Sequence, residues 1–576
     1  MDEFYQTKRQ RLDDLKAQLD ADFFSFKTLY QDLSDYFLPT RGRFVLSTDS
    51  NRGDRRNNKI IDPTGYLSAR TLSSGMQAGI TSPARPWKRL TTPDPDLAEY
   101  GPVREWLDVV DQRMTTYFLR SNLYNVLPLA YSDLGVFGTS CIFMDKDMDS
   151  VSNFMSFPLG SFRFAKNVKG QINVFTREFR MTVRQLIEKF GDYDPKTGKP
   201  NWNKFSTAIR NLWDRSQYET WIEVGHVIEP NMQHDPGRLE SKFKPFSSCY
   251  YELSTREYSG GDERFLRESG YDYFPILGPR WQVTGQDVYG TDSPGILSLG
   301  DNKQLQHGEK RAAQAIDKMI NPPLKATSGL KKTRASIVSG DITYLDDPNE
   351  RFEAVHEVRI DLSHLNAKQA EVRQRIQRAF FEDLFLMLSN SDRREFTATE
   401  IMERKEEKLL ALGPVLEQLN KDVLDPLIDN QFMLMNEAGL IPPAPEELQG
   451  MPLKVEYISI MAQSQKMAGI ATMDHFISGV TQIAEIYPQA LKKVDFNEYI
   501  DQRADAMGIS ARIVRSDDRV QELIAAEEQA MRGQQQVEAI NQLSGAARNL
   551  GQVDMSKDTA LTRLAEQAQA GQLVQQ

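Results

Sequence analysis

Cysteine is scarce in this chain of 576 residues, and long apolar runs are missing. Only Cys141 and Cys249 occur, which excludes a disulfide framework and predicts two small buried side chains in a reducing compartment. No stretch approaches the roughly 18 uninterrupted apolar residues of a membrane-spanning helix. The start from Met1 to Leu15 is densely charged and has no apolar signal-peptide core, so we expect a water-soluble protein made and kept in the cytoplasm.

Motifs for catalysis and metal binding are also missing. The nearest match to a phosphate-binding loop, Gly191 to Pro200, ends in Gly-Lys-Pro and lacks the hydroxyl that binds magnesium. Three aspartates imitate the start of a calcium loop, but serines stand where its glycine and bidentate glutamate belong (Asp145, Asp147, Asp149; Ser150, Ser156). The six histidines show no paired spacing. The sequence predicts no metal, no cofactor and no enzyme, although carboxylates brought together by folding stay open.

The composition is that of an ordinary globular protein, with 40% hydrophobic and 26% charged residues. Its length predicts several packing units. The net charge of -11 argues against a protein that grips DNA phosphates over its whole surface, because such proteins need clustered Lys and Arg.

The N-terminal half mixes predicted helices and strands. Apolar residues at three- and four-residue steps predict a peripheral amphipathic helix (Leu12, Leu15, Leu19, Phe23, Phe26). Asp62 and Pro63 are typical of a helix start, and this helix should end near Met76. Helices are also expected at 102–119, 123–137 and 183–190, and strands at 141–144, 162–165, 172–179, 221–228 and 249–253, with a hairpin turn at 167–170.

Two segments of this half predict surfaces. Residues Arg41 to Lys59 form a basic loop, which is either a solvated connector or a polar contact with another subunit or nucleic acid. Gly75 and Gly79 lie among small residues, so another element could approach their helix closely.

The most regular apolar periodicity lies between Leu297 and Glu437. It predicts one long helix at 297–321, ended by prolines, and another at 366–388, with a short β-like insertion between them. The apolar positions are Leu305, Ala312, Ile316, Met319 and Ile320 in the first helix and Val372, Ile376, Phe380, Leu384 and Leu388 in the second.

A polar loop at 389–396 follows, with Asn390, Ser391, Asp392, Arg393 and Arg394. A capping box then starts a new helix, because the Thr397 hydroxyl can accept from the amide of Glu400 while the Glu400 carboxylate reaches back. This helix should run to about Glu437, with kinks at Pro414 and Pro426. Further helices are expected at 458–487 and 496–507, and the Gln- and Ala-rich tail is either flexible or helical only when packed against copies of itself.

Four stretches, in this order, carry a family resemblance. They are Leu72 to Leu90, Asp133 to Ser140 with its Phe-Gly-Thr, Arg280 to Gly295 with Tyr-Gly and Ser-Pro-Gly, and Thr397 to Lys405. On these motifs the chain resembles the podovirus portal (head-to-tail connecting) protein family of short-tailed bacteriophages, over residues 70 to about 440.

The resemblance implies a predominantly helical α+β portal-type fold in a ring of twelve copies at one capsid vertex, through which double-stranded DNA is packaged and ejected. The implied regions are a wing (1–296), stem helices (297–321 and 366–388) flanking a clip (322–365), a tunnel loop (389–396), a long wing helix with its connector (397–457), a crown (458–525), and a helical barrel or flexible tail (526–576). Implied partners are the terminase large subunit, a tail adaptor, capsid and scaffolding proteins, and internal core or ejection proteins. The implied location is the virion portal vertex, with assembly in the host cytoplasm.

The residues expected to serve this role fall into three groups. The DNA-facing tunnel loop would contain Asn390, Ser391, Asp392, Arg393 and Arg394; the stem helices would use Ile316, Met319, Ile376, Phe380 and Leu384; Thr397 and Glu400 would cap the wing helix. A solvated helix connector is the alternative for the loop. Another virion structural protein, such as a tail adaptor or internal core protein, and a magnesium-dependent nuclease are the alternatives for the whole chain.

Overall fold

The computed structural model describes most of the chain in two compact units. The described residues are 7–44, 58–94, 97–98, 100–193, 200–253, 264–320, 324–326, 353–354, 363–389, 412–448, 453–458, 473–484, 486–506, 520–527, 529 and 531. The first unit comprises Met1–Ala98 and Pro102–Asp474, and the second comprises Glu99–Gly101 and His475–Gln576. The predicted α+β, predominantly helical class is confirmed. Within the described part, no helix is both long and apolar enough to span a bilayer.

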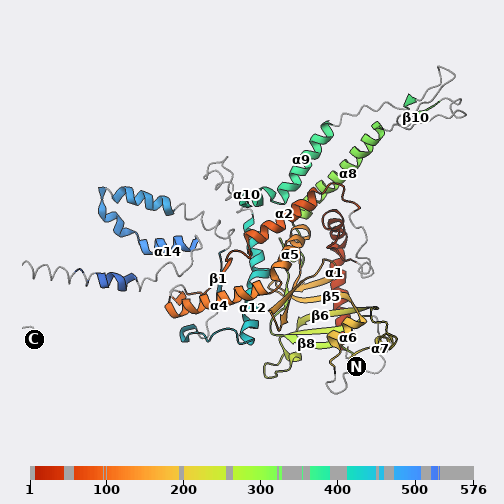
Figure 1. Cartoon of the computed structure of the whole chain (residues 1–576), viewed down its shortest axis with the longest axis horizontal. Coiled ribbons are helices and arrows are strands. Elements are labelled where there is room, and N and C mark those ends of the chain that lie inside the picture. The colour runs from red at the N-terminus through yellow and green to blue at the C-terminus, as the bar shows by residue number, and fades with distance from the viewer. Residues whose placement is uncertain are drawn as a thin grey trace, which may run out of the picture. The chain divides into compact units, whose positions relative to one another are not determined.

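A five-stranded antiparallel sheet forms one side of the first unit (Figure 1). Its strands run in the order β4 (Phe162–Lys166), β5 (Ile172–Thr182), β6 (Trp221–Pro230), β7 (Phe246–Glu252) and β8 (Arg267–Tyr271). The predicted hairpin turn between β4 and β5 is confirmed, because the amide of Gly170, at a φ of 80°, donates to the carbonyl of Asn167. Because successive side chains of a strand point to opposite faces of the sheet, each face packs against different helices.

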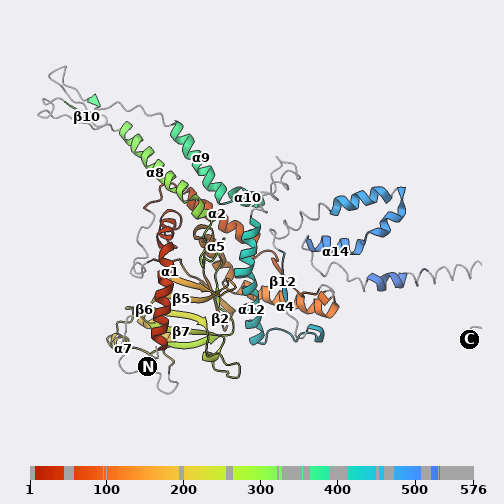
Figure 2. The same cartoon turned by 180° about the vertical axis from the view of Figure 1, so that it is seen from behind.

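Helices cover both faces of this sheet. Val224 and Tyr250 pack with α6 (Val183–Phe190) and α7 (Thr207–Asp214), whereas Val227 and Tyr251 pack with Leu12 of α1 (Lys8–Tyr36). Figure 2 shows α1 running along the sheet.

The expectation that α1 is peripheral was wrong. Phe23 and Tyr30 are buried in the main core, and their rings lie 5.4 Å and 6.4 Å from the ring of Tyr289. The apolar stripe of α1 carries large aromatic side chains, which need a deep core and not only a surface groove.

Smaller strand pairs complete the β structure. A three-stranded sheet has the order β3 (Val151–Ser156), β2 (Ile142–Asp147) and β9 (Ile276–Leu277). Two further sheets have two strands each. In one, β1 (Lys88–Thr91) pairs with β12 (Lys454–Tyr457), and in the other β10 (Leu324–Lys325) pairs with β11 (Glu353–Ala354). The sequence did not predict the β1–β12 pair, since four-residue strands leave almost no alternating pattern.

Helix α5 (Leu123–Phe137) is the central helix of the first unit, and its bounds match the prediction. It packs on α2 (Thr64–Gly79), while α4 (Gly101–Arg120) adds Val103, Val110 and Met114 to the same core. The predicted close approach at Gly75 is present, because a Cβ there would lie 2.1 Å from Cδ1 of Phe385.

Two long helices lead away from the sheet side by side in both views (Figures 1 and 2). Helix α8 (Pro294–Ile320) starts three residues before the predicted Leu297, because the Ser293 hydroxyl accepts from the amide of Ile296. Its companion is α9 (Ser363–Ala379).

The single helix predicted at 366–388 was wrong. It breaks between α9 and α10 (Glu382–Ser389), where Phe381 has a φ of 54°. Phe380 is fully buried, the Phe381 ring lies 6.3 Å from that of Trp281, and Phe385 reaches Gly75. These aromatic side chains make contacts in different directions before and after the break, and the backbone turns at Phe381 to allow them. Apolar periodicity alone does not reveal such a turn.

The chain is helical again at 412–419, widens into a π-helix at Asn420–Leu424, and continues as α12 (Asp425–Glu437). The π turn lies just before Pro426, which lacks an amide donor. The helix predicted to begin near Ile458 begins later, because the amide of Ile458 extends the β1–β12 ladder by donating to the carbonyl of Trp87.

The second unit contains a 3-10 helix (Pro488–Lys493), α14 (Phe496–Ala506) and a helical stretch at 520–527. Large apolar side chains remain exposed in it, including Ile486, Tyr487, Ile500 and Ile524. The other short helices of the structure are 3-10 turns at Trp202–Lys204, Ser241–Phe243 and Glu446–Leu448.

Candidate functional site

The predicted tunnel loop and helix cap lie outside the described residues. This holds for Asn390, Ser391, Asp392, Arg393 and Arg394, for Thr397 and Glu400, and for the fourth motif, Thr397 to Lys405. Their roles stay predictions.

The predicted stem residues divide into two sets. Ile316 and Met319 of α8 are 42% and 45% exposed, near the end of the helix that is farthest from the sheet. Ile376, Phe380 and Leu384 are fully buried, and the Phe380 ring lies 5.7 Å from that of Phe37. Leu384 belongs to α10 and not to the long helix α9. The first set is therefore available to a neighbour, whereas the second anchors the helix pair to the body.

A polar junction fixes α8 to the start of α2. The Gln306 amide oxygen accepts from the backbone amides of Ile61 (2.7 Å) and Asp62 (2.8 Å), and its nitrogen donates to the carbonyl of Asp62 and to Asn302. Sequence reasoning missed this junction, although Asn302 and Gln306 lie one turn apart beside the predicted core position Leu305.

Arg373 extends the same junction to α9. Its Nε donates to Asp62 at 2.8 Å, and its other nitrogen pairs with Glu309 of α8. Burial opposes ionisation of Asp62, but hydrogen bonds from Thr64 and Arg373 outweigh this effect and hold the pKa of Asp62 below its ordinary value. Both long helices are thus tied to Asp62, α9 through its carboxylate and α8 through its backbone.

A buried ion pair joins the third resemblance motif to the π turn. Arg280 donates through two nitrogens to Asp422 (both 2.9 Å), and their side chains are 4% and 7% exposed. Arg280 also donates to the carbonyl of Gly170, and Gln418 donates to Asp422. The sequence offered no sign of the pairing because the partners lie 142 positions apart.

The second and third motifs interlock through their backbones. The Thr139 hydroxyl accepts from the amide of Gly290 at 2.7 Å, and the Ser293 hydroxyl donates to the carbonyl of Val136. A Cβ at Gly290 would lie 2.0 Å from the carbonyl oxygen of Gly138. The Gly-Thr and Tyr-Gly sequences are therefore explained by close packing of two chain segments.

Asp133 of the second motif is fully buried and pairs with Arg41, whose second nitrogen also donates to Ser156. The basic-loop interpretation of Arg41 to Lys59 was therefore wrong for Arg41, which is part of the interior. Lys59, at the other end, is exposed and pairs with Asp35. Residues 45–57 lie outside the described ranges.

The three aspartates of the imitated calcium loop lie in a surface hairpin, with Asp145 and Asp147 in β2 and Asp149 in the turn. Asp147 accepts from the amide and the hydroxyl of Ser150 between β2 and β3. In the part of the chain that the structure describes, no group of three His, Cys, Asp or Glu side chains is arranged to hold a metal.

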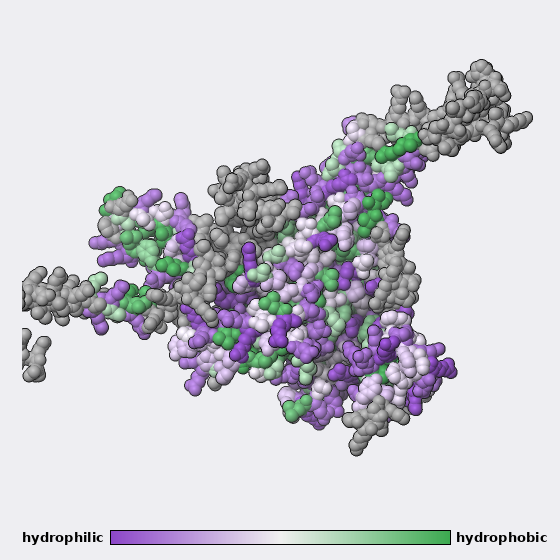
Figure 3. All heavy atoms as spheres, viewed as in Figure 1, coloured by the Kyte–Doolittle hydropathy of each residue, from purple (hydrophilic) through white to green (hydrophobic). Residues whose placement is uncertain are grey.

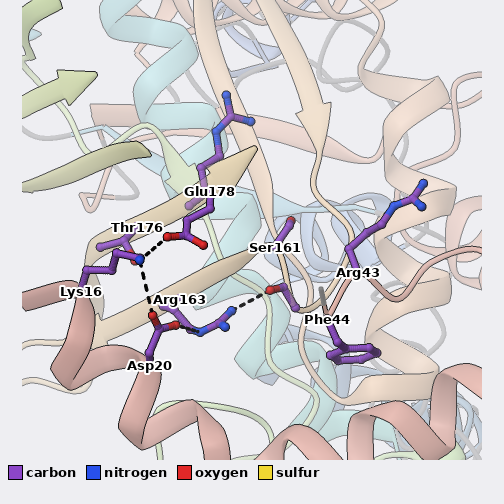
Figure 4. A pocket seen from close by; sticks show the side chains of 10 residues that line it. Lys16, Asp20, Arg43, Phe44, Ser161, Arg163, Thr176 and Glu178 are labelled. Atoms are coloured by element: carbon purple, nitrogen blue, oxygen red, sulfur yellow. Dashed lines mark hydrogen bonds and ion pairs between the residues drawn. The ribbon is translucent and has the colours of Figure 1, made fainter. Parts of the chain in front are cut away.

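One polar cavity, of about 140 Å³, lies between α1 and the sheet (Figure 4). Lys16 pairs with Glu178 and lies 3.9 Å from Asp20, and Arg163 contacts Asp20 at 2.8 Å. Lys16 and Arg163 are paired with Glu178 and Asp20, so this part of the cavity is an ion-paired seam between α1 and the sheet. Arg43 and Arg177 also line the cavity.

His226 is buried in the sheet, stacked on Tyr250 at 3.7 Å and hydrogen-bonded to Ser248. Burial lowers its pKa well below the ordinary value, with a smaller contribution from Arg177, so the ring is neutral at pH 7. This is the environment of a core histidine.

Comparison with known proteins identifies relatives over the whole chain. It is 44% identical over 572 residues to "Portal protein" of Salmonella phage epsilon15, with 98% of this chain and 100% of that one covered. It is 41% identical over 560 residues to "Probable portal protein" of Bordetella phage BPP-1, with 97% and 98% covered.

Two solved structures are matched with low scores. They are the virion of a native gene transfer agent particle (TM-score 0.27, 10% identity) and the neck of an empty particle of that kind (TM-score 0.30, 9% identity), each covering 68% of this chain and 91% of the other. The family model described as "Bacteriophage head to tail connecting protein" matches residues 9–514. The chain therefore belongs to the bacteriophage head to tail connecting protein family.

Proposed function

We propose that this chain is a portal protein of a short-tailed bacteriophage, which forms a closed ring at one capsid vertex and acts as the channel for packaging and ejecting DNA. The observation that carries the proposal is the 44% identity to a portal protein that is matched along its whole length. A tail adaptor or internal core protein is disfavoured for the same reason. In this role the chain acts as a conduit and not as an enzyme.

The long helix pair supports assembly into a ring. Apolar side chains of α8 are open to water in the single chain, notably Leu297 (72%), Ile316 (42%), Met319 (45%) and Ile320 (78%). Figure 3 shows apolar surface near the outer end of this pair. A cyclic ring needs one surface of each subunit to meet a different surface of the next, and this helix provides one such surface.

We assign α8 and α9 to the stem, with the clip at 322–365 between them, the tunnel loop at 389–396, the wing at 1–296 and 397–457, the crown at 458–525, and a helical barrel or flexible tail at 526–576. Exposed apolar residues of the second unit, such as Tyr487 and Ile500, fit a crown that packs against its neighbours. Twelve copies are expected from the family resemblance.

The negative net charge of the chain favours a channel through which DNA passes over one that holds DNA in place. Twelve copies would carry a formal charge of 12 × -11 = -132, which favours a lumen that holds phosphates weakly. Helix α9 carries Lys368, Arg373, Arg375 and Arg378 against Glu371. Arg373 pairs with Asp62 and Glu309, and Arg375 pairs with Asp301, so Arg378 is the stem cation that we assign to contacts with DNA. Cations of the stem and of the tunnel loop would then give a few evenly spaced contacts with the DNA backbone.

The expected partners are the terminase large subunit at the clip, a tail adaptor, capsid and scaffolding proteins, and internal core or ejection proteins. The chain would reside in the virion after assembly in the host cytoplasm. No cofactor is required for any of these contacts.

The tunnel loop provides a test of the channel role. Replacing Arg393 and Arg394 by alanine should leave ring assembly intact but change the amount of DNA packaged or retained per particle, because two cations per subunit would be lost from the lumen. Packaged DNA is measured as nuclease-protected genome per capsid, with Arg184→Ala, an exposed residue of α6, as the control. Unchanged DNA content would contradict the loop's role, and failure to assemble would instead make these arginines interfacial.

A further inference from the structure

An apolar groove of about 510 Å³ lies on the first unit. It is built from Trp106 of α4, five residues of α12, the β1–β12 pair and the loop that follows α12. Its lining residues include Leu90, Trp106, Ile428, Asp429, Phe432, Met433, Asn436, Ile441, Leu448, Leu453 and Val455. The volume accommodates one or two large side chains of another molecule.

The groove is formed by rigid elements. Trp106 donates from its indole nitrogen to the carbonyl of Pro442 at 3.0 Å, and Arg113 donates to the carbonyl of Leu440. These bonds fix the loop after α12 against α4. Met433 is 50% exposed between them, so an unbranched, adaptable side chain forms part of the open surface.

Carboxylates lie in and beside this apolar surface. Asp429 lines the groove, and the charged group that acts on it among the described residues is the like-charged Asp425. Asp425, one turn earlier, accepts from the Tyr457 hydroxyl and carries a further negative charge. Glu446 and Glu447 are exposed on the turn that supplies Leu448. Partial burial, together with Asp425, raises the pKa of Asp429.

We propose that this groove docks a segment of another protein in which a lysine or arginine stands beside large aliphatic or aromatic residues. The apolar side chain would occupy the space between Trp106 and Met433, and the cation would pair with Asp429. Charge complementarity selects this occupant. Nucleic acid is repelled by the carboxylates, whereas a segment that is both basic and apolar complements the surface.

The inference is independent of the channel role and is tested on the assembled full-length protein. A phage-display library of random 12-residue peptides is selected on the immobilised wild type. The expected consensus pairs Lys or Arg with Leu, Ile, Phe, Met or Trp. A consensus peptide is then synthesised with a fluorescent label, and its affinity is measured by fluorescence anisotropy.

Matched variants locate the binding. Asp429→Lys with Met433→Glu should weaken binding by at least about tenfold, which corresponds to about 1.4 kcal/mol. The control places the same changes on the β2–β3 turn, as Asp149→Lys with Met148→Glu. Met148 is 92% exposed and neither residue lines the groove, so this variant should bind like the wild type. The variant Asp429→Asn removes the charge but keeps the shape of the side chain, so it should fold like the wild type and bind the peptide several-fold more weakly. It separates loss of binding from a folding defect.

Three results would overturn the proposal. One is a selection whose peptides bind the groove variants as well as the wild type. Another is a consensus that lacks basic residues. The third is a consensus that matches an exposed segment of this chain, because the groove would then be an interface between copies.

Discussion

Arg280 and Asp422 show how one residue pair can join distant parts of this chain. The guanidinium makes two hydrogen bonds of 2.9 Å to the carboxylate, and both side chains are almost completely buried. Removing one partner leaves the other as an uncompensated charge in the interior. The pair links the third motif to the π turn at Asn420–Leu424, so its loss should loosen both.

Asp422→Asn should therefore lower the free energy of unfolding by about 3 kcal/mol. The control is Glu219→Gln, because the Arg184–Glu219 pair is 62% and 64% exposed and should contribute less than about 1 kcal/mol. Urea unfolding followed by tryptophan fluorescence measures both. Equal effects of the two substitutions would show that the Arg280–Asp422 pair does not stabilise the body.

Asp62 gives the junction of the long helices a pH dependence. Its pKa is lowered in the folded protein, so the ionised form is stabilised by folding. That contribution is present above the ordinary pKa of about 3.9 and is lost as the pH falls through the lowered value. Asp62→Asn should cost about 1–2 kcal/mol at pH 7, and its urea midpoint should approach that of the wild type as the pH falls below about 4. A gap that stays constant from pH 7 to pH 3.5 would contradict this role of Asp62.

At the scale of elements, the contact between α2 and α10 depends on the absence of a side chain. A Cβ at Gly75 would lie 2.1 Å from the Phe385 ring, so α10 can pack this closely only against glycine. The turn at Phe381 directs Phe385 toward this position. The same contact therefore fixes the segment that leads into the predicted tunnel loop.

Gly75→Ala should destabilise the protein by about 2 kcal/mol, because crowding of the Phe385 ring exceeds the gain in helix propensity. Gly300→Ala in α8 is the matched control: nothing lies within 4 Å of the added methyl, and stability should rise by about 0.5–1 kcal/mol. Thermal unfolding should show a lower midpoint for Gly75→Ala and a higher midpoint for Gly300→Ala than for the wild type. If both substitutions stabilise, α10 does not pack on α2 as described.

The same elements show which parts of the fold the sequence could predict. The bounds of helices α5 and α6 agree with the predicted ranges, since their apolar periodicity is strong and glycine ends each of them. The break at Phe381 and the β1–β12 pair were missed, because both arise from contacts between segments far apart in the chain. For the candidate site, Ile316 and Ile376 both occupy apolar positions of a predicted helix, so the sequence does not distinguish them. The structure shows that Ile316 is exposed and Ile376 is buried.

At the scale of the whole molecule, the single chain leaves apolar surface that a folded protein would normally bury. Ile316, Met319 and Ile320 lie open on α8, and Phe476, Ile486 and Tyr487 lie open on the C-terminal part. Association of copies would cover such surface. Closure into a ring also explains why a chain of net charge -11 can serve as a DNA conduit, since the wall need only be weakly attractive.

Class-averaged electron microscopy of the purified full-length protein tests the central proposal most directly. We expect closed rings of twelve subunits around a through-channel, with the α8–α9 pairs side by side along its wall. Monomers that persist at high concentration, or rings without an open centre, would contradict it.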